Sequence, residues 1–216
     1  MKALLKKEFR FLHPACYLSF LFVTLLFIPN YPIAVVFFFP LTVSINIFLS
    51  SISENNDLLF CSLLPIRKKD YVRAKLNFIL FFELAFLLLS LPLLITRNML
   101  FKDSFLPTNP GIDSILSVYG FTFLVYGLYN VILLTMYFHT APKRHFAYIV
   151  SLIVAFVAFT FFGVILAYIP IIGPSLDYGG DLFYQYLYFF LGLLLFIVFN
   201  YVAYKVSCKE LKKKDF

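Results

Sequence analysis

Six apolar runs, separated by short polar segments, dominate this chain. We place them at residues 14–28, 33–52, 73–96, 114–138, 146–169 and 182–204. About 20 predominantly apolar residues let an α-helix cross the hydrocarbon core of a bilayer, and most of these runs approach that length. With 62% hydrophobic residues and a mean hydropathy of +0.91, the chain is too apolar for a soluble domain of 216 residues. The sequence therefore predicts an all-α polytopic membrane protein with six transmembrane helices in one domain, residues 1–216.

Basic residues are distributed unequally between the two sides of these runs. Of 18 lysine and arginine residues, 16 lie in the N-terminal segment, the loop after the second run, the turn at 139–145 or the C-terminal tail. The other two, Arg97 and Lys102, lie in an expected external loop from Arg97 to Asp113. Because cytoplasmic loops are rich in lysine and arginine, we expect both termini to be cytosolic. The net charge of +7 then reflects membrane topology, and we expect no nucleic-acid partner.

Residues 2–12 have the pattern of a helix that lies in the membrane interface. Its apolar residues fill one arc of a helical wheel, and its lysines and arginine fill the other. Glu8 is the exception, because it falls within the apolar arc. We favour a side chain that snorkels to water from a short helix, and the alternative is an ion pair with a basic residue of the 67–75 loop.

The loop from Ser53 to Lys75 must leave the bilayer, yet its middle is apolar. A loop that only had to reach water would not need Leu58, Leu59, Phe60, Leu63 and Leu64. If Asp57 to Leu64 forms two helical turns, these side chains spread nearly all round the axis, so the helix is stable only when other protein surrounds it. Pro65 ends the segment, because proline disfavours helical geometry in the preceding residue. We predict a cytosolic segment that inserts into a groove on another protein.

The same loop carries an ordered set of residue types. The loop contains, in this order, an acidic residue, a leucine-rich turn, Leu-Pro, a basic cluster, a β-branched residue and a lysine. These are Glu54, Leu58, Leu63, Leu64, Pro65, Arg67, Lys68, Val72 and Lys75. In this order the loop resembles that of ABC-2 type transporter permeases, in which it forms a coupling helix docked on the nucleotide-binding subunit. The resemblance implies that Asp57–Leu64, called the coupling segment below, contacts an ATPase. The residues it assigns to this contact are Glu54, Asp57, Leu58, Phe60, Leu63, Leu64, Pro65 and Arg67.

A narrower resemblance rests on the opening MKALLKKEFRFLHP and on residues 29–32, PNYP. Both resemble the short permeases of Gram-positive bacteria, including the membrane subunits of the phenol-soluble-modulin exporter. This resemblance implies a multi-pass permease of a bacterial cytoplasmic membrane that expels amphipathic, cytolytic or antimicrobial-type peptides. Two permeases, identical or related, would assemble with two copies of a cytosolic ABC ATPase that binds ATP and magnesium. The alternative is self-protection against, or multidrug efflux of, a lipophilic compound.

Motifs for catalysis are absent from the sequence. Without GxxxxGK[ST] the chain has no P-loop, so an ATPase must be a separate polypeptide. Neither HExxH nor GxSxG occurs, and the three histidines are not spaced for metal binding on one helix. We therefore predict no catalytic residue, no metal site and no cofactor in this chain. An intramembrane enzyme, resting on Glu83 alone, and a small immunity or structural protein are weaker hypotheses, since neither needs the coupling segment.

Polar residues within the runs are candidates for a substrate path. Glu83 lies about 10 Å along the third predicted helix from its cytosolic end. Such a charge marks either a functional site facing the bundle interior or a carboxyl group held protonated or bridged to a tyrosine or a backbone carbonyl. In the fourth run, three- and four-residue spacing puts four polar residues on one helical face: Tyr119, Thr122, Tyr126 and Asn130. This face either lines a path for an amphipathic substrate or, as we favour, joins helices by hydrogen bonds.

Small residues recur every four positions in the fifth run, at Ala147, Ser151 and Ala155. Small side chains let neighbouring helix backbones approach closely within a membrane. We therefore predict that this face of the fifth helix packs against another helix.

Overall fold

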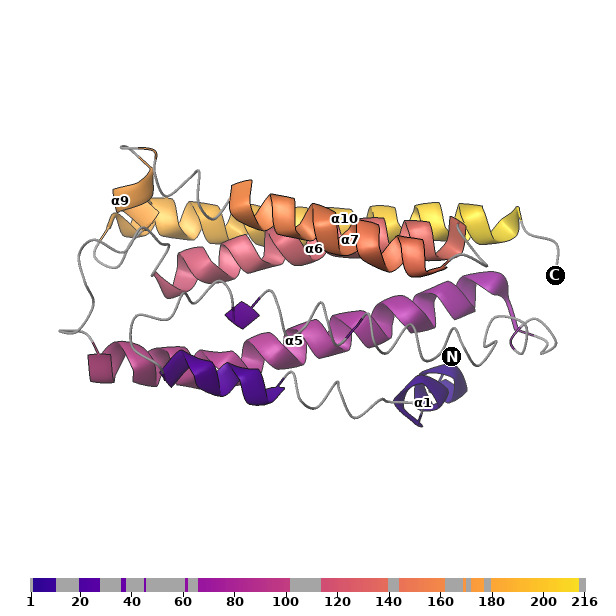
Figure 1. The fold of residues 1–216 in the computed structure, drawn as a ribbon, viewed down its shortest axis with the longest axis horizontal. Helices are drawn as coiled ribbons and strands as arrows, with labels where there is room; N and C mark the ends of the chain where they lie inside the picture. The colour runs from indigo at the N-terminus through magenta and orange to yellow at the C-terminus, as the bar shows by residue number, and fades with distance from the viewer. Residues whose placement is uncertain are drawn as a thin grey trace.

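The computed structural model describes residues 2–10, 20–27, 36–37, 45, 61, 66–101, 114–139, 144–161, 169, 172–176 and 180–213. All secondary structure within these ranges is helical. The longer helices lie lengthwise beside one another (Figure 1): α5 (Lys68–Phe101), α6 (Ile115–His139), α7 (Arg144–Thr160) and α10 (Leu182–Lys212). Three shorter elements are α1 (Lys2–Arg10), a 3₁₀ helix, η1 (Phe22–Phe27), and α9 (Gly173–Leu176).

Among the described residues, three helices are long and apolar enough to cross a membrane, namely α5 over Lys68–Leu100, α6, and α10. The apolar part of α7, Phe146–Thr160, is shorter. These four helices correspond to the last four predicted spans. The predicted spans at 14–28 and 33–52 lie outside the described residues, except for 20–27, 36–37 and 45. The all-helical class is therefore confirmed for the described residues, whereas the total of six spans stays a prediction.

The helix α5 extends beyond the predicted span 73–96 at both ends. The expectation that Arg97 begins an external loop is therefore wrong. Arg97 lies inside α5, and only 1% of its surface is exposed. The reason is that three more apolar residues, Met99, Leu100 and Phe101, follow Arg97 and Asn98, so the helix continues for another turn and Arg97 is buried within it.

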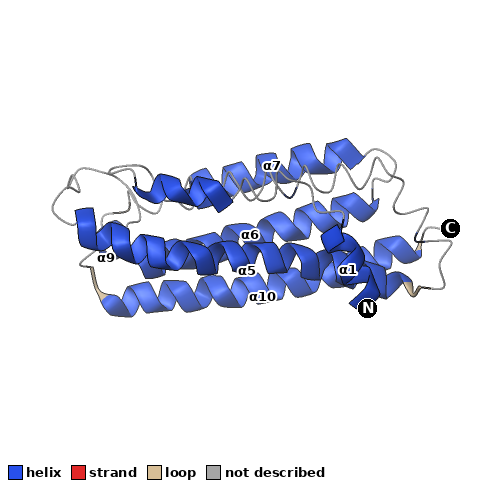
Figure 2. Cartoon of the chain, turned by 90° about the horizontal axis from the view of Figure 1, so that it is seen from below, coloured by secondary structure: helices blue, strands red, loops and turns tan. Residues whose placement is uncertain are grey.

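Both chain ends lie at the same end of the bundle, on the right in Figures 1 and 2. There the short helix α1 lies across the long axis, whereas the long helices run along it. Apart from Arg97, every described lysine and arginine lies in α1 or near a helix end on this side. This strongly basic end agrees with the charge distribution from which we predicted the topology.

Glycine residues let α6 and α10 pack closely. A Cβ atom added to Gly120 would lie 2.8 Å from the carbonyl oxygen of Tyr188, and one added to Gly192 would overlap the backbone of Gly120. A Cβ at Gly127 would lie 3.1 Å from Cα of Phe196. Helices in lipid associate through such close packing, because the lipid itself is as apolar as their side chains.

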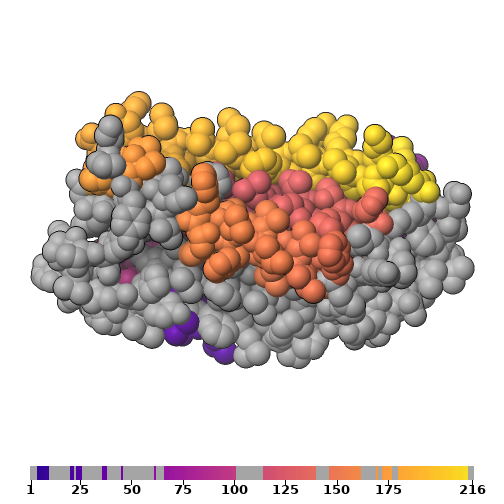
Figure 3. All heavy atoms as spheres, turned by 45° about the horizontal axis from the view of Figure 1, so that its top comes forward, coloured from indigo at the N-terminus to yellow at the C-terminus, as the bar shows by residue number. Residues whose placement is uncertain are grey.

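The helix α7 covers another face of α6. Its small residues Ala147, Ser151 and Ala155 have no exposed surface, which confirms the predicted packing face. Phe146 and Ile153 point away, with 57% and 56% of their surface exposed. In Figure 3 the side chains of α7 and α10 spread over one side of the molecule, with α6 between them.

Glu8 does not snorkel to water, so the interpretation that we favoured is wrong. Its Oε2 atom accepts a hydrogen bond from Nζ of Lys75 at 2.7 Å, and the side chains of Glu8 and Lys75 are 0% and 1% exposed. The pair forms because α1 packs its apolar arc, Glu8 included, against the first turns of α5. The alternative partner in the 67–75 loop is therefore confirmed, although Lys75 belongs to α5.

We expect Gly192→Ala to lower the free energy of unfolding by roughly 1–3 kcal/mol, because the added methyl group meets backbone that cannot move aside cheaply. Unfolding in mixed micelles, followed by circular dichroism, measures the change. Leu191→Ala is the matched control, since Leu191 is 49% exposed. Its effect should stay within about 0.5 kcal/mol. Equal unfolding midpoints for the two variants would contradict the close α6–α10 contact.

Candidate functional site

The residues assigned to ATPase coupling fall mainly outside the described part of the chain. Glu54, Asp57, Leu58, Phe60, Leu63, Leu64 and Pro65 all lie there. Arg67 is described, is exposed and immediately precedes α5. Its carbonyl oxygen accepts hydrogen bonds from the backbone N–H groups of Asp70 (2.9 Å) and Tyr71 (3.3 Å). Arg67 therefore starts the helix that follows the coupling segment, and a role in ATPase coupling stays a prediction for all eight residues.

All five substrate-path candidates are buried in the bundle. Glu83 and Asn130 have no exposed surface, Tyr126 has 1%, Thr122 has 2% and Tyr119 has 7%. Glu83 comes from α5, and the other four come from α6. None of them faces outward from the described chain.

A polar cluster joins three helices near the middle of the bundle. The Nδ2 atom of Asn130 donates to Oε2 of Glu83 at 2.9 Å and to Oδ1 of Asn200 at 3.0 Å. The Nδ2 atom of Asn200 in turn donates to the carbonyl oxygen of Phe196 at 2.8 Å. Asn130 therefore uses both amide hydrogens to connect α5 with α10 through α6. We call Glu83, Asn130 and Asn200 the amide–carboxyl cluster.

Tyr119 and Tyr126, on the same face of α6 as Asn130, also form hydrogen bonds with other segments. The hydroxyl of Tyr119 donates to the carbonyl oxygen of Leu87 at 2.8 Å and lies 2.9 Å from the hydroxyl of Ser90. The hydroxyl of Tyr126 donates to the carbonyl oxygen of Phe37 at 2.5 Å. Thr122 differs, because it donates to Val118 of its own helix. The interpretation that we favoured, hydrogen bonds between segments, is therefore confirmed for Tyr119, Tyr126 and Asn130. It is wrong for Thr122.

Two acceptor atoms of the amide–carboxyl cluster have no hydrogen-bond donor among the described residues. They are Oε1 of Glu83 and Oδ1 of Asn130, both inaccessible to solvent. A buried acceptor without a donor costs free energy, so this cluster can gain from a ligand or a rearrangement that supplies one. The groups present can accept hydrogen bonds or attract a positive charge, and they form no nucleophile–base pair.

Asn200 and Ser90 belong to this arrangement and were not singled out from the sequence. Asn200 lies within the apolar run of α10, where an amide side chain is itself a signal, since polar side chains inside a membrane need partners. Ser90 gave a weaker signal, because a serine within a helix can bond to its own backbone, as Ser90 also does to Leu87.

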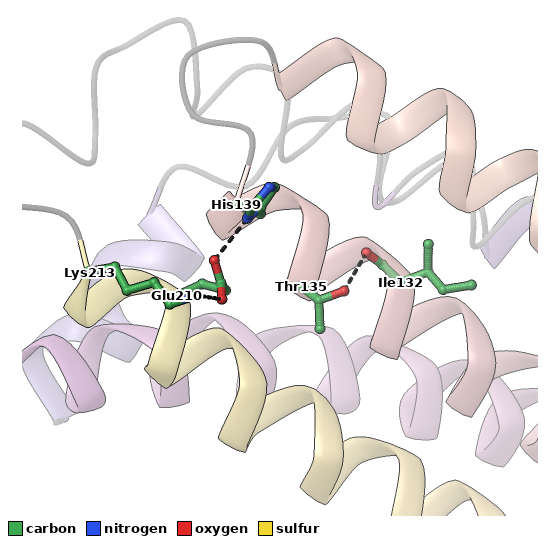
Figure 4. A network of polar contacts seen from close by, with 5 residues as sticks. All are labelled: Ile132, Thr135, His139, Glu210 and Lys213. Atoms are coloured by element: carbon green, nitrogen blue, oxygen red, sulfur yellow. Dashed lines mark hydrogen bonds and ion pairs between the residues drawn. The ribbon is translucent and has the colours of Figure 1, made fainter.

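A second polar network ties α6 to α10 at the basic end (Figure 4). Nδ1 of His139 lies 2.8 Å from Oε2 of Glu210, and Nζ of Lys213 donates to Oε1 of Glu210 at 2.6 Å. Nearby, Thr135 donates to the carbonyl oxygen of Ile132 at 3.2 Å, within α6. His139 is 70% exposed, and no group of three potential metal ligands occurs in the described part of the chain. The network fixes the ends of two helices.

Comparison with protein families gives a match over nearly the whole chain. The model of the family described as ABC-2 family transporter protein matches residues 3–212, a range that contains all the described long helices. Neither the comparison with curated proteins nor the comparison with solved structures gives a match.

We expect a double-mutant cycle with Glu83→Leu and Asn130→Leu to give a coupling free energy of about 1 kcal/mol, because either single change leaves the partner buried without its bond. Circular dichroism of unfolding in mixed micelles measures all four proteins. Thr122→Val replaces Asn130→Leu in the control cycle, since Thr122 bonds only within α6. That cycle should be additive. Additivity in both cycles would contradict an interhelical hydrogen bond between Glu83 and Asn130.

Proposed function

Because the chain belongs to the ABC-2 family of transporter proteins, we propose that it is the permease subunit of an ATP-driven exporter. The observation that carries the proposal is the family match over residues 3–212, together with helices long and apolar enough to cross a membrane. A permease provides the path through the membrane, and this chain has no P-loop of its own. Its energy would therefore come from a separate polypeptide.

The partner would be a cytosolic ABC ATPase, present in two copies, that binds ATP and magnesium. It would act on the coupling segment and thereby on α5, the continuous helix that begins at Lys68 directly after this loop. The basic end of the bundle supports a cytosolic location for both termini and for this contact. A second permease, identical or paralogous, would complete the transporter in a bacterial cytoplasmic membrane.

The proposed cargo is an amphipathic peptide, in line with the resemblance to the Gram-positive branch that includes the phenol-soluble-modulin exporter. Such a peptide needs aromatic surface together with a few polar groups, and Glu83, Tyr119, Tyr126 and Asn130 offer this mixture on adjoining helices. In the present arrangement these groups bond to one another or to neighbouring segments. Cargo would therefore have to replace these hydrogen bonds as the bundle opens.

Leu63→Asp should abolish co-purification of the ATPase or uncouple ATP hydrolysis from transport, while the permease still inserts. A carboxylate without a partner in an apolar groove costs several kcal/mol, enough to separate a modest interface. Leu63→Met is the control, because methionine conserves volume and apolar character. Affinity purification of the permease, with the ATPase quantified by immunoblot, gives the readout. Unchanged assembly and unchanged coupling in Leu63→Asp would count against the proposed function.

Cells that lack the permease should accumulate, or become sensitive to, short cationic amphipathic helical peptides. Glu83→Gln combined with Tyr126→Phe should slow peptide export without reducing insertion or ATPase binding, because it replaces a carboxyl group by an amide and removes a hydroxyl from the buried face. Tyr186→Phe is the control, since Tyr186 is 50% exposed on α10. ATP-dependent uptake of a labelled peptide into inside-out vesicles measures the export rate. Wild-type export by the double variant would refute this path, and loss of only uncharged lipophile efflux would favour the alternative cargo.

A further inference from the structure

The helix α1 contacts both sides of the junction between the coupling segment and α5. On one side, Nζ of Lys7 donates to Sγ of Cys61 at 3.2 Å, and Cys61 is the residue of the coupling segment that the structure describes. On the other side, Oε2 of Glu8 accepts from Nζ of Lys75 in α5 at 2.7 Å. Adjacent residues of one short helix therefore contact Cys61 of the coupling segment and Lys75 at the start of α5.

These contacts are shielded from water. Glu8 and Lys75 are 0% and 1% exposed, and Cys61 is 7% exposed. Nζ of Lys7 also lies 3.5 Å from Oε1 of Glu8, and the ammonium groups of Lys7 and Lys75 each lie 5.6 Å from the ring centroid of Tyr71. Opposite charges in a poorly polarisable environment attract strongly at contact, so separating them is unfavourable. The ion pair thus fixes the distance between α1 and α5, which sliding apolar contacts alone would not.

An aromatic contact fixes the orientation of α1 on the same surface. The ring of Phe9 meets the rings of Phe78 and Phe81 edge to face, with centroids 5.3 and 5.1 Å away. Since α5 is one continuous helix from Lys68 to Phe101, a displacement of its first turns is carried along its length. The contacts that hold α1 against α5 therefore also control how the first turns of α5 are displaced.

We propose that α1 is a positioning element for energy coupling, in which Lys7 and Glu8 bind the coupling segment to the start of α5. The two then move as one body when a partner acts on the segment. This inference rests on the proposed function, because it requires an ATPase at the coupling segment. Without the α1 contacts, the segment moves without carrying α5, and ATP is hydrolysed without transport.

The test compares Glu8→Gln with the charge swap Glu8→Lys plus Lys75→Glu in proteoliposomes that contain the permease–ATPase complex. Uptake of a labelled cationic amphipathic helical peptide and phosphate release are measured together. Glu8→Gln should lower the peptide transported per ATP by about tenfold or more while the complex stays intact, and the swap should restore it. Lys6→Gln, a change of an exposed lysine on the same helix, should have no effect.

A second measurement follows Cys61 in the permease without its partner. Maleimide labelling, located by peptide mass spectrometry, should be faster at Cys61 in Glu8→Gln than in the wild type. Cys208, which is 8% exposed near the end of α10, is the internal reference and should not change. A wild-type transport ratio with wild-type Cys61 labelling overturns the inference alone. A permease that retains no ATPase overturns the proposed function, and the inference with it.

Discussion

Charged and amide side chains inside an apolar bundle are stable only when other protein groups replace the water that they have lost. This constraint sets the orientation of α5, which is apolar round most of its circumference. Lys75, Glu83 and Arg97 are all buried, whereas Leu88 and Met99 are 71% and 77% exposed. The polar residues, spaced along the length of the helix, therefore determine which side faces the bundle. A helix without them would have had no strong preference between its faces.

The helix α6 lies at the centre of the bundle, where it packs closely against its neighbours and forms hydrogen bonds with them. Gly120 faces Gly192 of α10, and small residues of α7 pack with no exposed surface. Asn130 then bonds to both α5 and α10. Since apolar surfaces gain little by associating within lipid, close backbone approach and hydrogen bonds must supply the stability. The same residues that hold α6 in place include those that we propose for the substrate path.

Under the proposed function, this overlap would link the stability of the bundle with transport. Tyr126 and Asn130 are bonded to other parts of the chain, so a substrate gains contact with them only by exchanging partners. Glu83 and Asn130 each keep an acceptor atom without a donor among the described residues, which makes such an exchange cheaper there than at a fully satisfied site. At the basic end, the pair formed by Glu8 and Lys75 lies beside the coupling segment rather than the proposed path. Under the proposed function, the first of these buried polar sites would contact the cargo, and the second would couple α1 to α5.

The sequence by itself determined the helical class, the positions of the described long helices, the small-residue face of α7 and the concentration of basic residues at one end. These depend on composition and local spacing, which a single helix already expresses. Only the tertiary structure decided that Glu8 pairs with Lys75, that Arg97 is buried and that Asn200 completes the contact with Asn130. The physical reason is that helices apolar on nearly every face carry no periodic signal for their rotation. Which polar groups meet is then fixed by how whole helices pack against one another.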